Sequence, residues 1–155
     1  RRLHGRGPYK DHLWFVLRPM ATAADTEPGF YFEAAPEHYS YGMGSWNTTP
    51  QTMAKLRARM DRDPKPMERL TRDLERQTEF SLEAENYKRP RSAPSRPALA
   101  PWYQAKSFAI THQDKLTDEL FCRDIVAHLQ QGFSFLLPYY DYFVTLDGDP
   151  DPREL

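Results

Sequence analysis

Continuous and alternating apolar runs in the first third of the chain predict three β-strands. The segment Leu13–Leu17 is apolar throughout and rich in residues that favour strands, so we expect a buried strand. The segment 29–35 repeats this composition after a loop, and we expect the two strands to pair antiparallel. In the segment 38–44 aromatic and small residues alternate, and its two glycines predict a strand that bends or closely approaches another backbone.

Apolar residues at helical spacing follow and predict two helices. Thr49 can cap a first turn, and Pro50 loses no hydrogen bond at the first helical position, so a helix begins there. We expect this helix to end before Pro64, because a proline inside a helix lacks the backbone N–H and clashes with the preceding turn. A second, shorter helix is expected over residues 66–74.

Strands and helices are both expected in the second half of the chain. Alternating apolar positions predict strands over residues 80–84 and 105–111, with an irregular, proline-rich stretch between them. Thr117 can cap a long helix that ends at Gly132. A further helix is expected over residues 136–145.

The order of these elements predicts the fold class. It lacks the regular strand–helix alternation of a doubly wound sheet, so we expect an α+β fold, with an antiparallel sheet of about five strands packed against about four helices. Residues 1–146 form one domain in this interpretation. Repeated aspartate and proline then indicate an acidic tail over residues 147–155.

Net charge, apolar run length and cysteine content limit the kinds of partner and the location that we expect for this protein. A chain of 155 residues with a formal net charge of -1 creates no long-range field that would attract nucleic acid or an anionic membrane, so neither partner is expected. No apolar run reaches the length of a membrane span. The single cysteine, Cys122, excludes an internal disulfide, suits a cytoplasmic location and is expected to pack inside its helix. The oligomeric state is left open.

Metal and cofactor sites are not expected. The five histidines lack the close spacings of a metal site, although distant histidines can converge in a fold. The segment 42–44 is too short for a phosphate-binding glycine loop, and it lacks the strand–loop–helix order of such loops.

Two basic segments carry the candidate chemistry. One precedes the Leu13–Leu17 strand, where a cation, a phenol and an imidazole can hold an anion or transfer a proton. Strand geometry would place Lys10 and His12 on one face. The other lies in a stretch, 86–113, without acidic residues. The candidate ligand-binding residues are Arg1, Arg6, Tyr9, Lys10, Lys88, Arg89 and Arg91, and His12 is the candidate catalytic residue.

Three functional interpretations follow from these segments if they meet in space. The first is binding of a small phosphate-, nucleotide- or acidic-sugar-like anion in a basic, aromatic pocket. The second is an enzyme that acts on such a ligand with His12 as acid or base. The third is a scaffold without a pocket, in which Lys10 pairs with Asp11, while Lys88 and Arg89 neutralise nearby glutamates and most aromatic rings form the core.

Six short segments, spread over nearly the whole chain, resemble the uncharacterised bacterial and fungal family called domain of unknown function 2461. These segments are Pro8-Tyr9-Lys10, Pro28 to Phe32, Tyr41-Gly42-Met43-Gly44 with Thr49-Pro50, Met53 to Arg57, Tyr87 to Arg91, and Trp102 to Ser107. Members of the family begin with helices upstream of Pro-Tyr-Lys, so the resemblance implies an N-terminally incomplete domain. It implies a fold and candidate positions, but no activity.

Overall fold

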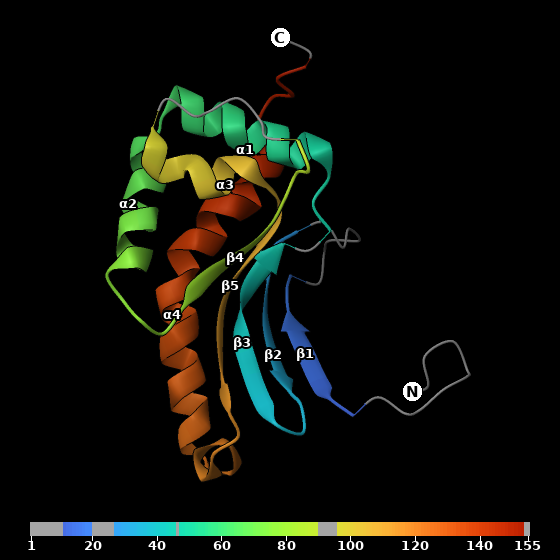
Figure 1. The fold of residues 1–155 in the computed structure, drawn as a ribbon, viewed down its shortest axis with the longest axis vertical. Coiled ribbons are helices and arrows are strands. Elements are labelled where there is room, and N and C mark those ends of the chain that lie inside the picture. The colour runs from blue at the N-terminus through green and yellow to red at the C-terminus, as the bar shows by residue number, and fades with distance from the viewer. Residues whose placement is uncertain (1–10, 20–26, 46, 90–95, 154–155) are drawn as a thin grey trace, which may run out of the picture.

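The computed structural model describes residues 11–19, 27–45, 47–89 and 96–153. In this part of the chain five antiparallel strands form one sheet in the order β1-β2-β3-β5-β4, with four α-helices (Figure 1). The predicted α+β fold is therefore confirmed. The strands are β1 Leu13–Leu17, β2 Gly29–Ala34, β3 His38–Ser45, β4 Ser81–Asn86 and β5 Ala105–Lys115. The helices are α1 Pro50–Arg62, α2 Lys65–Glu75, α3 Ala100–Gln104 and α4 Asp124–Val144, with short 3-10 helices η2 Pro97–Leu99, η3 Asp118–Phe121 and η4 Thr145–Gly148.

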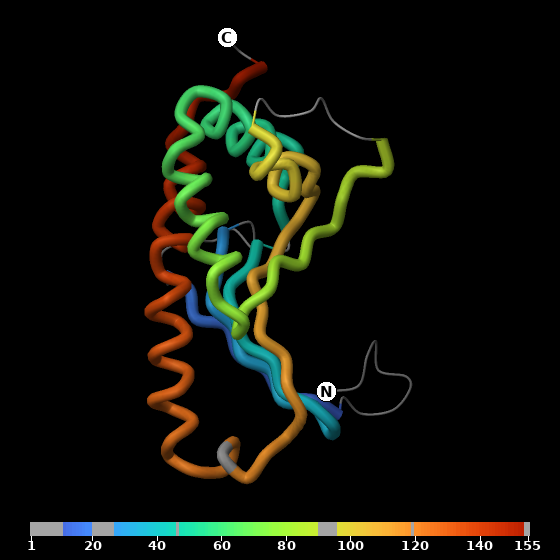
Figure 2. Tube along the Cα trace, turned by 60° about the vertical axis from the view of Figure 1, so that its left-hand side comes forward, coloured from blue at the N-terminus to red at the C-terminus, as the bar shows by residue number. Residues whose placement is uncertain are grey.

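The sheet has one covered face and one open face. Helix α4 runs along one side of the strands, and no described helix lies on the other side (Figure 2). The covered face carries the apolar members of each alternating strand, including Tyr41, Met43 and Ile110, all fully buried. Burying each such side chain contributes about 1.5–3 kcal/mol.

Helices α1, α2 and α3 close the upper end of the sheet in Figure 1. Thr49 accepts a hydrogen bond from the backbone N–H of Thr52 and Pro50 follows it, so α1 begins as predicted. Trp102 on α3 packs against the rings of Phe108 and Phe143, and its indole N–H donates to Thr71 Oγ1 at 3.0 Å. This contact joins three helices to the sheet.

Strand β1 differs from the prediction in its burial. It pairs antiparallel with β2 as expected, but four of its five side chains are exposed. The prediction of a buried strand is wrong, because β1 is an edge strand and, among the described residues, α4 makes ring contacts with β2, β3 and β5 but not with β1.

The C-terminal helices also differ from the prediction. Two helices separated at Gly132 were expected, whereas one helix, α4, continues through Gly132 and Pro138. Gly132, Leu136, Tyr139 and Phe143 are buried at helical spacing, so packing against the sheet overrides the local signals to stop. The short helix α3 was not predicted. Cys122, expected to be packed, is exposed between η3 and α4.

The segment after Leu146 contacts helix α1. Arg59 Nε lies 2.6 Å from Asp149 Oδ2, and Gln51 donates to Asp151 at 2.8 Å. Within the described residues, none of the helices has the length and apolar character needed to cross a membrane.

Candidate functional site

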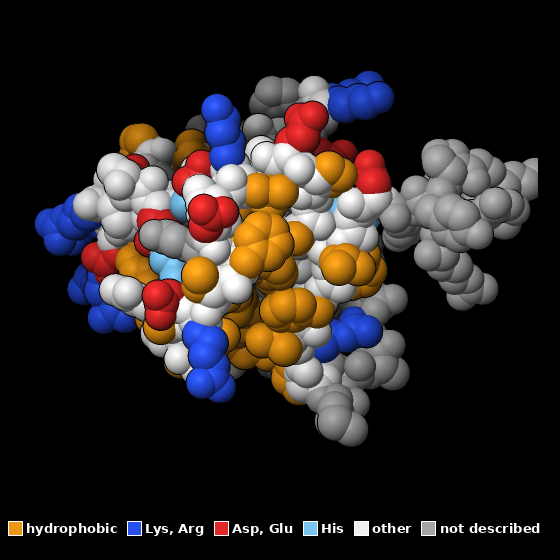
Figure 3. All heavy atoms as spheres, turned by 90° about the horizontal axis from the view of Figure 1, so that it is seen from below, with side chains coloured by type: hydrophobic (Ala, Val, Ile, Leu, Met, Phe, Trp, Pro, Cys, Tyr) orange, Lys and Arg blue, Asp and Glu red, His pale blue; other side chains and the backbone are white. Residues whose placement is uncertain are grey.

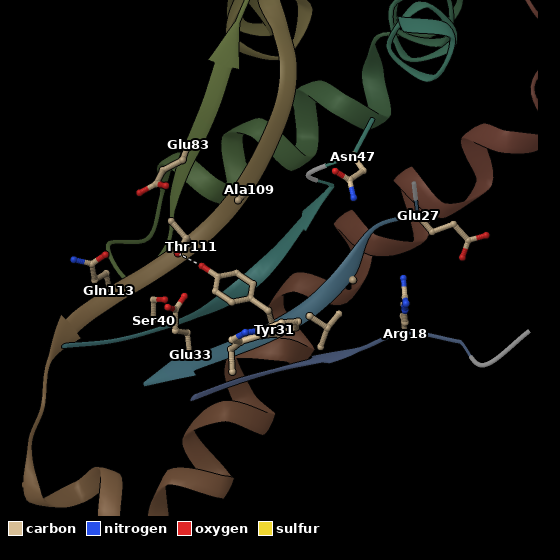
Figure 4. A pocket seen from close by; sticks show the side chains of 13 residues that line it. Arg18, Glu27, Tyr31, Glu33, Ser40, Asn47, Glu83, Ala109, Thr111 and Gln113 are labelled. Carbon is tan, nitrogen blue, oxygen red and sulfur yellow. Dashed lines mark hydrogen bonds between the residues drawn. The ribbon is translucent and has the colours of Figure 1, made fainter. Parts of the chain in front are cut away.

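The open face of the sheet holds a cavity of about 740 Å³ (Figure 4). Every strand contributes the side chains that point away from α4. The lining residues are Trp14, Val16, Arg18, Glu27, Gly29, Tyr31, Glu33, Ser40, Asn47, Glu83, Ala109, Thr111 and Gln113. The cavity is thus built by strand alternation, with apolar neighbours of the same strands facing the core.

Tyr31 lies at the centre of this cavity in Figure 4. In the sheet register Tyr31 on β2 opposes Gly42 on β3, and Gly42 opposes Thr111 on β5. The missing side chain at Gly42 lets the ring of Tyr31 extend over β3, and its hydroxyl shares a hydrogen bond with Thr111 Oγ1. Three adjacent strands are therefore joined across the floor of the cavity.

Burial, hydrogen bonds and the charges of two carboxylates all act on the Tyr31 hydroxyl. Burial raises its pKa above the ordinary value, hydrogen bonds from Thr111 and Ser40 oppose that shift, and the charges of Glu83 and Glu33 add to it. The phenol is consequently a neutral hydrogen-bonding group at physiological pH. Among the described lining residues, three carry a carboxylate and one carries a guanidinium.

Trp14 supplies the apolar surface of the cavity at its β1 side. It opposes Glu33 in the β1–β2 register, and Val16 opposes Tyr31. The indole is exposed. An aromatic face therefore lies next to hydrogen-bond acceptors, as in sites that hold a ligand with both apolar and polar surface.

A second group of titratable side chains lies on the covered face. Tyr41 donates to the Glu79 carboxylate, and His128 Nε2 lies 3.1 Å from both Tyr41 Oη and Glu79 Oε1. The Nδ1–H of His112 donates to the Glu79 carbonyl oxygen at 2.9 Å. Burial, followed by the bond to Glu79, raises the pKa of Tyr41.

This second group joins β3, β5, α4 and the loop before β4. Gly132 lies against the Tyr41 ring, because an added Cβ there would be 2.5 Å from a ring carbon. The sequence indicated that distant histidines can converge, but it did not indicate that His112 and His128 are the two that do. No set of three or more side chains suited to hold a metal occurs in the described residues, and the group's contacts are those of a structural network.

The candidates ahead of β1 are described only from Asp11 onward. Arg1, Arg6, Tyr9 and Lys10 lie outside the described residues, as does Arg91 of the other segment. His12 is half-buried, with Nδ1 3.3 Å from Asp11 Oδ1 and Nε2 3.9 Å from Glu33 Oε1. Since Glu33 lines the cavity, His12 stands at its margin.

Lys88 and Arg89 are exposed beyond the end of β4. Asn86 pairs with Ala105 at the start of β5, whereas the β1 end that carries His12 lies level with Lys115 at the opposite end. β1 and β4 are also opposite edges of the sheet. The structure therefore does not bring His12 together with Lys88 and Arg89.

Sequence reasoning missed most of the cavity. Tyr31, Thr111 and Gln113 line the cavity but are not among the candidates predicted from the sequence. A signal was present, because polar residues alternate with apolar ones on β2 and β5, and such residues share one face of a strand. Which strands are neighbours was the missing information.

The fold and the cavity define an α+β domain with a ligand-sized site on the open face of an antiparallel sheet. Residues 1–142 match the family model described as conserved hypothetical protein (DUF2461), and the chain belongs to this family. No curated protein and no solved structure matches the chain.

Proposed function

We propose that this protein binds a small, neutral, hydroxyl-rich ligand of sugar type on the open face of its sheet. The observation that carries this proposal is the composition of the cavity, in which Trp14 and Tyr31 lie among carboxylate and amide side chains. A volume of about 740 Å³ falls in the range of small-molecule sites.

The lining suits both surfaces of a sugar ring. The indole of Trp14 offers a flat apolar face on which the C–H side of a pyranose can lie. Carboxylates such as Glu33 and Glu83 accept hydrogen bonds from hydroxyl groups, and the amide of Gln113 can donate or accept. Such a site needs no charge on the ligand.

The anionic ligand predicted from the sequence has weaker support. Three carboxylates against one guanidinium in the lining disfavour a phosphate or an acidic sugar. Lys88 and Arg89 lie at the far corner of the sheet. An anion would therefore depend on candidates outside the described residues. The cytoplasmic location likewise stays a prediction.

A second candidate function is catalysis on the bound ligand with His12 as acid or base. The contact that favours it is the 3.9 Å separation between His12 Nε2 and Glu33 Oε1 at the margin of the cavity. An imidazole beside a carboxylate can transfer protons near neutral pH. Ligand turnover that is lost in His12→Asn would support catalysis, and turnover unchanged in that variant would exclude this role.

Isothermal titration of the whole chain tests the binding proposal. The ligands are a panel of neutral mono- and oligosaccharides, together with inorganic phosphate, a nucleoside monophosphate and a uronic acid. We expect a saturable signal for at least one neutral sugar. Trp14→Ala and Glu83→Gln should each weaken its binding by about tenfold, equivalent to about 1.4 kcal/mol. Tyr31→Phe should do so less strongly, because the ring remains.

Matched variants away from the cavity serve as controls. Phe121→Ala removes an exposed aromatic ring from η3, Glu75→Gln neutralises an exposed carboxylate on α2, and Tyr103→Phe removes a phenol that donates to Asp61. These three should leave binding unchanged. Preferential binding of the anions, or equal losses in cavity and control variants, would contradict the proposal. An absence of binding to every ligand would favour the scaffold interpretation.

A further inference from the structure

Within the part of the chain that the structure describes, the outer edge of β1 is an unprotected strand edge. No strand of the described residues pairs with it, so its outward backbone N–H and C=O groups lack sheet partners. The exposed fractions are 80% for Leu13, 57% for Trp14, 44% for Phe15 and 51% for Leu17. Between residues 13 and 17 there is no charge, proline or register shift that would oppose pairing.

The other edge of the sheet, β4, has these protections. Glu83 and Glu85 place charges on it, and the register with β5 shifts between Glu85 and Asn86. Charged side chains and bulges are the usual means by which edge strands avoid further pairing. The two edges of the sheet therefore differ. β4 carries charges and a register shift that oppose pairing with another strand, and β1 carries neither.

We propose that β1 pairs antiparallel with β1 of a second copy of this chain, forming a two-fold dimer with one continuous sheet. With the two-fold axis at Phe15, each Leu13 lies opposite Leu17 of the second copy, and each Trp14 lies opposite Val16. Every opposed pair is apolar, and an axis perpendicular to the sheet keeps α4 of both copies on the same face. Such a self-complementary contact covers the β1 edge of both copies and leaves β4 of each copy as an outer edge of the joined sheet.

The covered face extends this apolar contact. Phe15 stacks on Phe32 with ring centroids 5.5 Å apart, and Phe30 packs against Phe133 and Tyr140 of α4. Leu137 lies between those two α4 rings at helical spacing and is exposed. Figure 3 shows hydrophobic side chains gathered in a broad patch on the face of the molecule seen from below.

The size of this surface fits a second copy. The exposed side chains of β1 and Leu137 offer apolar area on the order of 500 Å² per copy, which matches the apolar share of a standard interface of about 800 Å² per partner. In a dimer the outward backbone groups of each β1 strand form hydrogen bonds with the other copy, and the exposed apolar side chains of both copies are covered. Both follow because a two-fold interface uses the same surface on each copy.

Pairing in this register also changes the cavity. Trp14 of the second copy would lie beside Val16, on the open face and next to the β1 side of the cavity, so each site gains an indole from its neighbour. This consequence rests on the proposed function, whereas the strand pairing does not.

Light scattering and sedimentation of the whole chain over a range of concentrations test the pairing. We expect a mass of twice 18.2 kDa that falls to the single value on dilution. Leu13→Glu should weaken association at least tenfold, because its carboxylate would lie against Leu17 of the second copy. Adding Leu17→Lys to the same chain should restore the dimer, since the introduced carboxylate and ammonium groups would then face each other between the two copies. High salt should reverse that rescue, because it screens the attraction between these two charges.

Phe121→Glu, which alters an exposed apolar residue on η3, is the matched control and should leave the mass unchanged. Circular dichroism of each variant establishes that it is folded. A monomer at all concentrations, a dimer insensitive to Leu13→Glu, or failure of Leu17→Lys to rescue would each overturn the proposed pairing. A monomer that binds a sugar would refute only the dimer, and a dimer that binds no sugar would refute only the proposed function.

Discussion

At the scale of single residues, Gly42 decides whether the cavity can form. A Cβ at this position would lie 2.1 Å from the carbonyl oxygen of Ile110 and 3.0 Å from Cα of Thr111. Both neighbours are backbone atoms of β5 and cannot move without shifting the strand. Because Gly42 has no side chain, the ring of Tyr31 can extend across β3 and its hydroxyl can reach Thr111.

Gly42→Ala should therefore lower the free energy of unfolding by about 2 kcal/mol or more, through overpacking against a strand in the middle of the sheet. Urea denaturation measures this change. Gly148→Ala is the matched control, since an added Cβ there meets no atom within 4 Å, and we expect a change of at most about 0.5 kcal/mol. Equal effects of the two substitutions would show that β3 and β5 can separate freely at Gly42.

At the scale of elements, the C-terminal segment is held to α1 by charge-assisted hydrogen bonds. Arg59 donates to the carbonyl oxygens of Tyr142 and Thr145 as well as to Asp149, so it joins α1 to the end of α4. Asp151 accepts from Gln51 and from Arg153. These bonds favour the ionised form of both aspartates.

Acid should weaken this attachment in a defined pH range. The side chain of Arg153 is the main cause that lowers the pKa of Asp151 from 3.8 to about 2. Because the folded pKa is depressed, the stabilisation is present above the ordinary value and is lost as the pH falls from 3.8 towards 2.

Asp151→Asn should consequently be less stable than the unaltered chain at neutral pH, and the difference should shrink as the pH approaches 2. Denaturation at a series of pH values measures it. Asp118→Asn, at an exposed position of η3, controls for the loss of one negative charge. A difference for Asp151→Asn that stays constant over the whole pH range would mean that ionisation of Asp151 does not strengthen the attachment.

At the scale of the whole molecule, the sheet separates two kinds of chemistry. The face against α4 buries aromatic and aliphatic side chains and carries a network in which Tyr41 is buried while Glu79 and His128 are exposed. The open face carries the polar partners of the same strands and forms the cavity. With a formal net charge of -1, the molecule adds no strong global field to the local charges of that face.

Binding of the proposed neutral ligand should therefore depend little on salt. Its affinity should change by less than about twofold between ~0.05 and ~0.5 M sodium chloride, because screening acts only on charged partners. Titration at several salt concentrations measures this, with phosphate as the comparison ligand. A steep loss of affinity for the preferred ligand as salt rises would instead indicate an anion held by cations.

Local patterns predicted much of the fold because each depends on neighbours in sequence. Thr49 and Pro50 begin α1, and the alternation in β2 and β3 yields two strands whose bounds lie close to those predicted. The close backbone approach expected for the third strand is confirmed at Gly42. The same local reasoning failed at Gly132, where a residue typical of helix ends fits against the ring of Tyr41.

The sequence by itself determined the fold class, the family and the positions of most strands, because propensity, capping and periodicity act over a few residues. Only the tertiary structure decided which strands are neighbours, and with that the exposure of β1, the separation of His12 from Lys88, and the cavity around Tyr31. These features depend on contacts between residues as far apart as Tyr31 and Thr111. Such contacts arise from the packing of the whole chain and leave no local pattern to read.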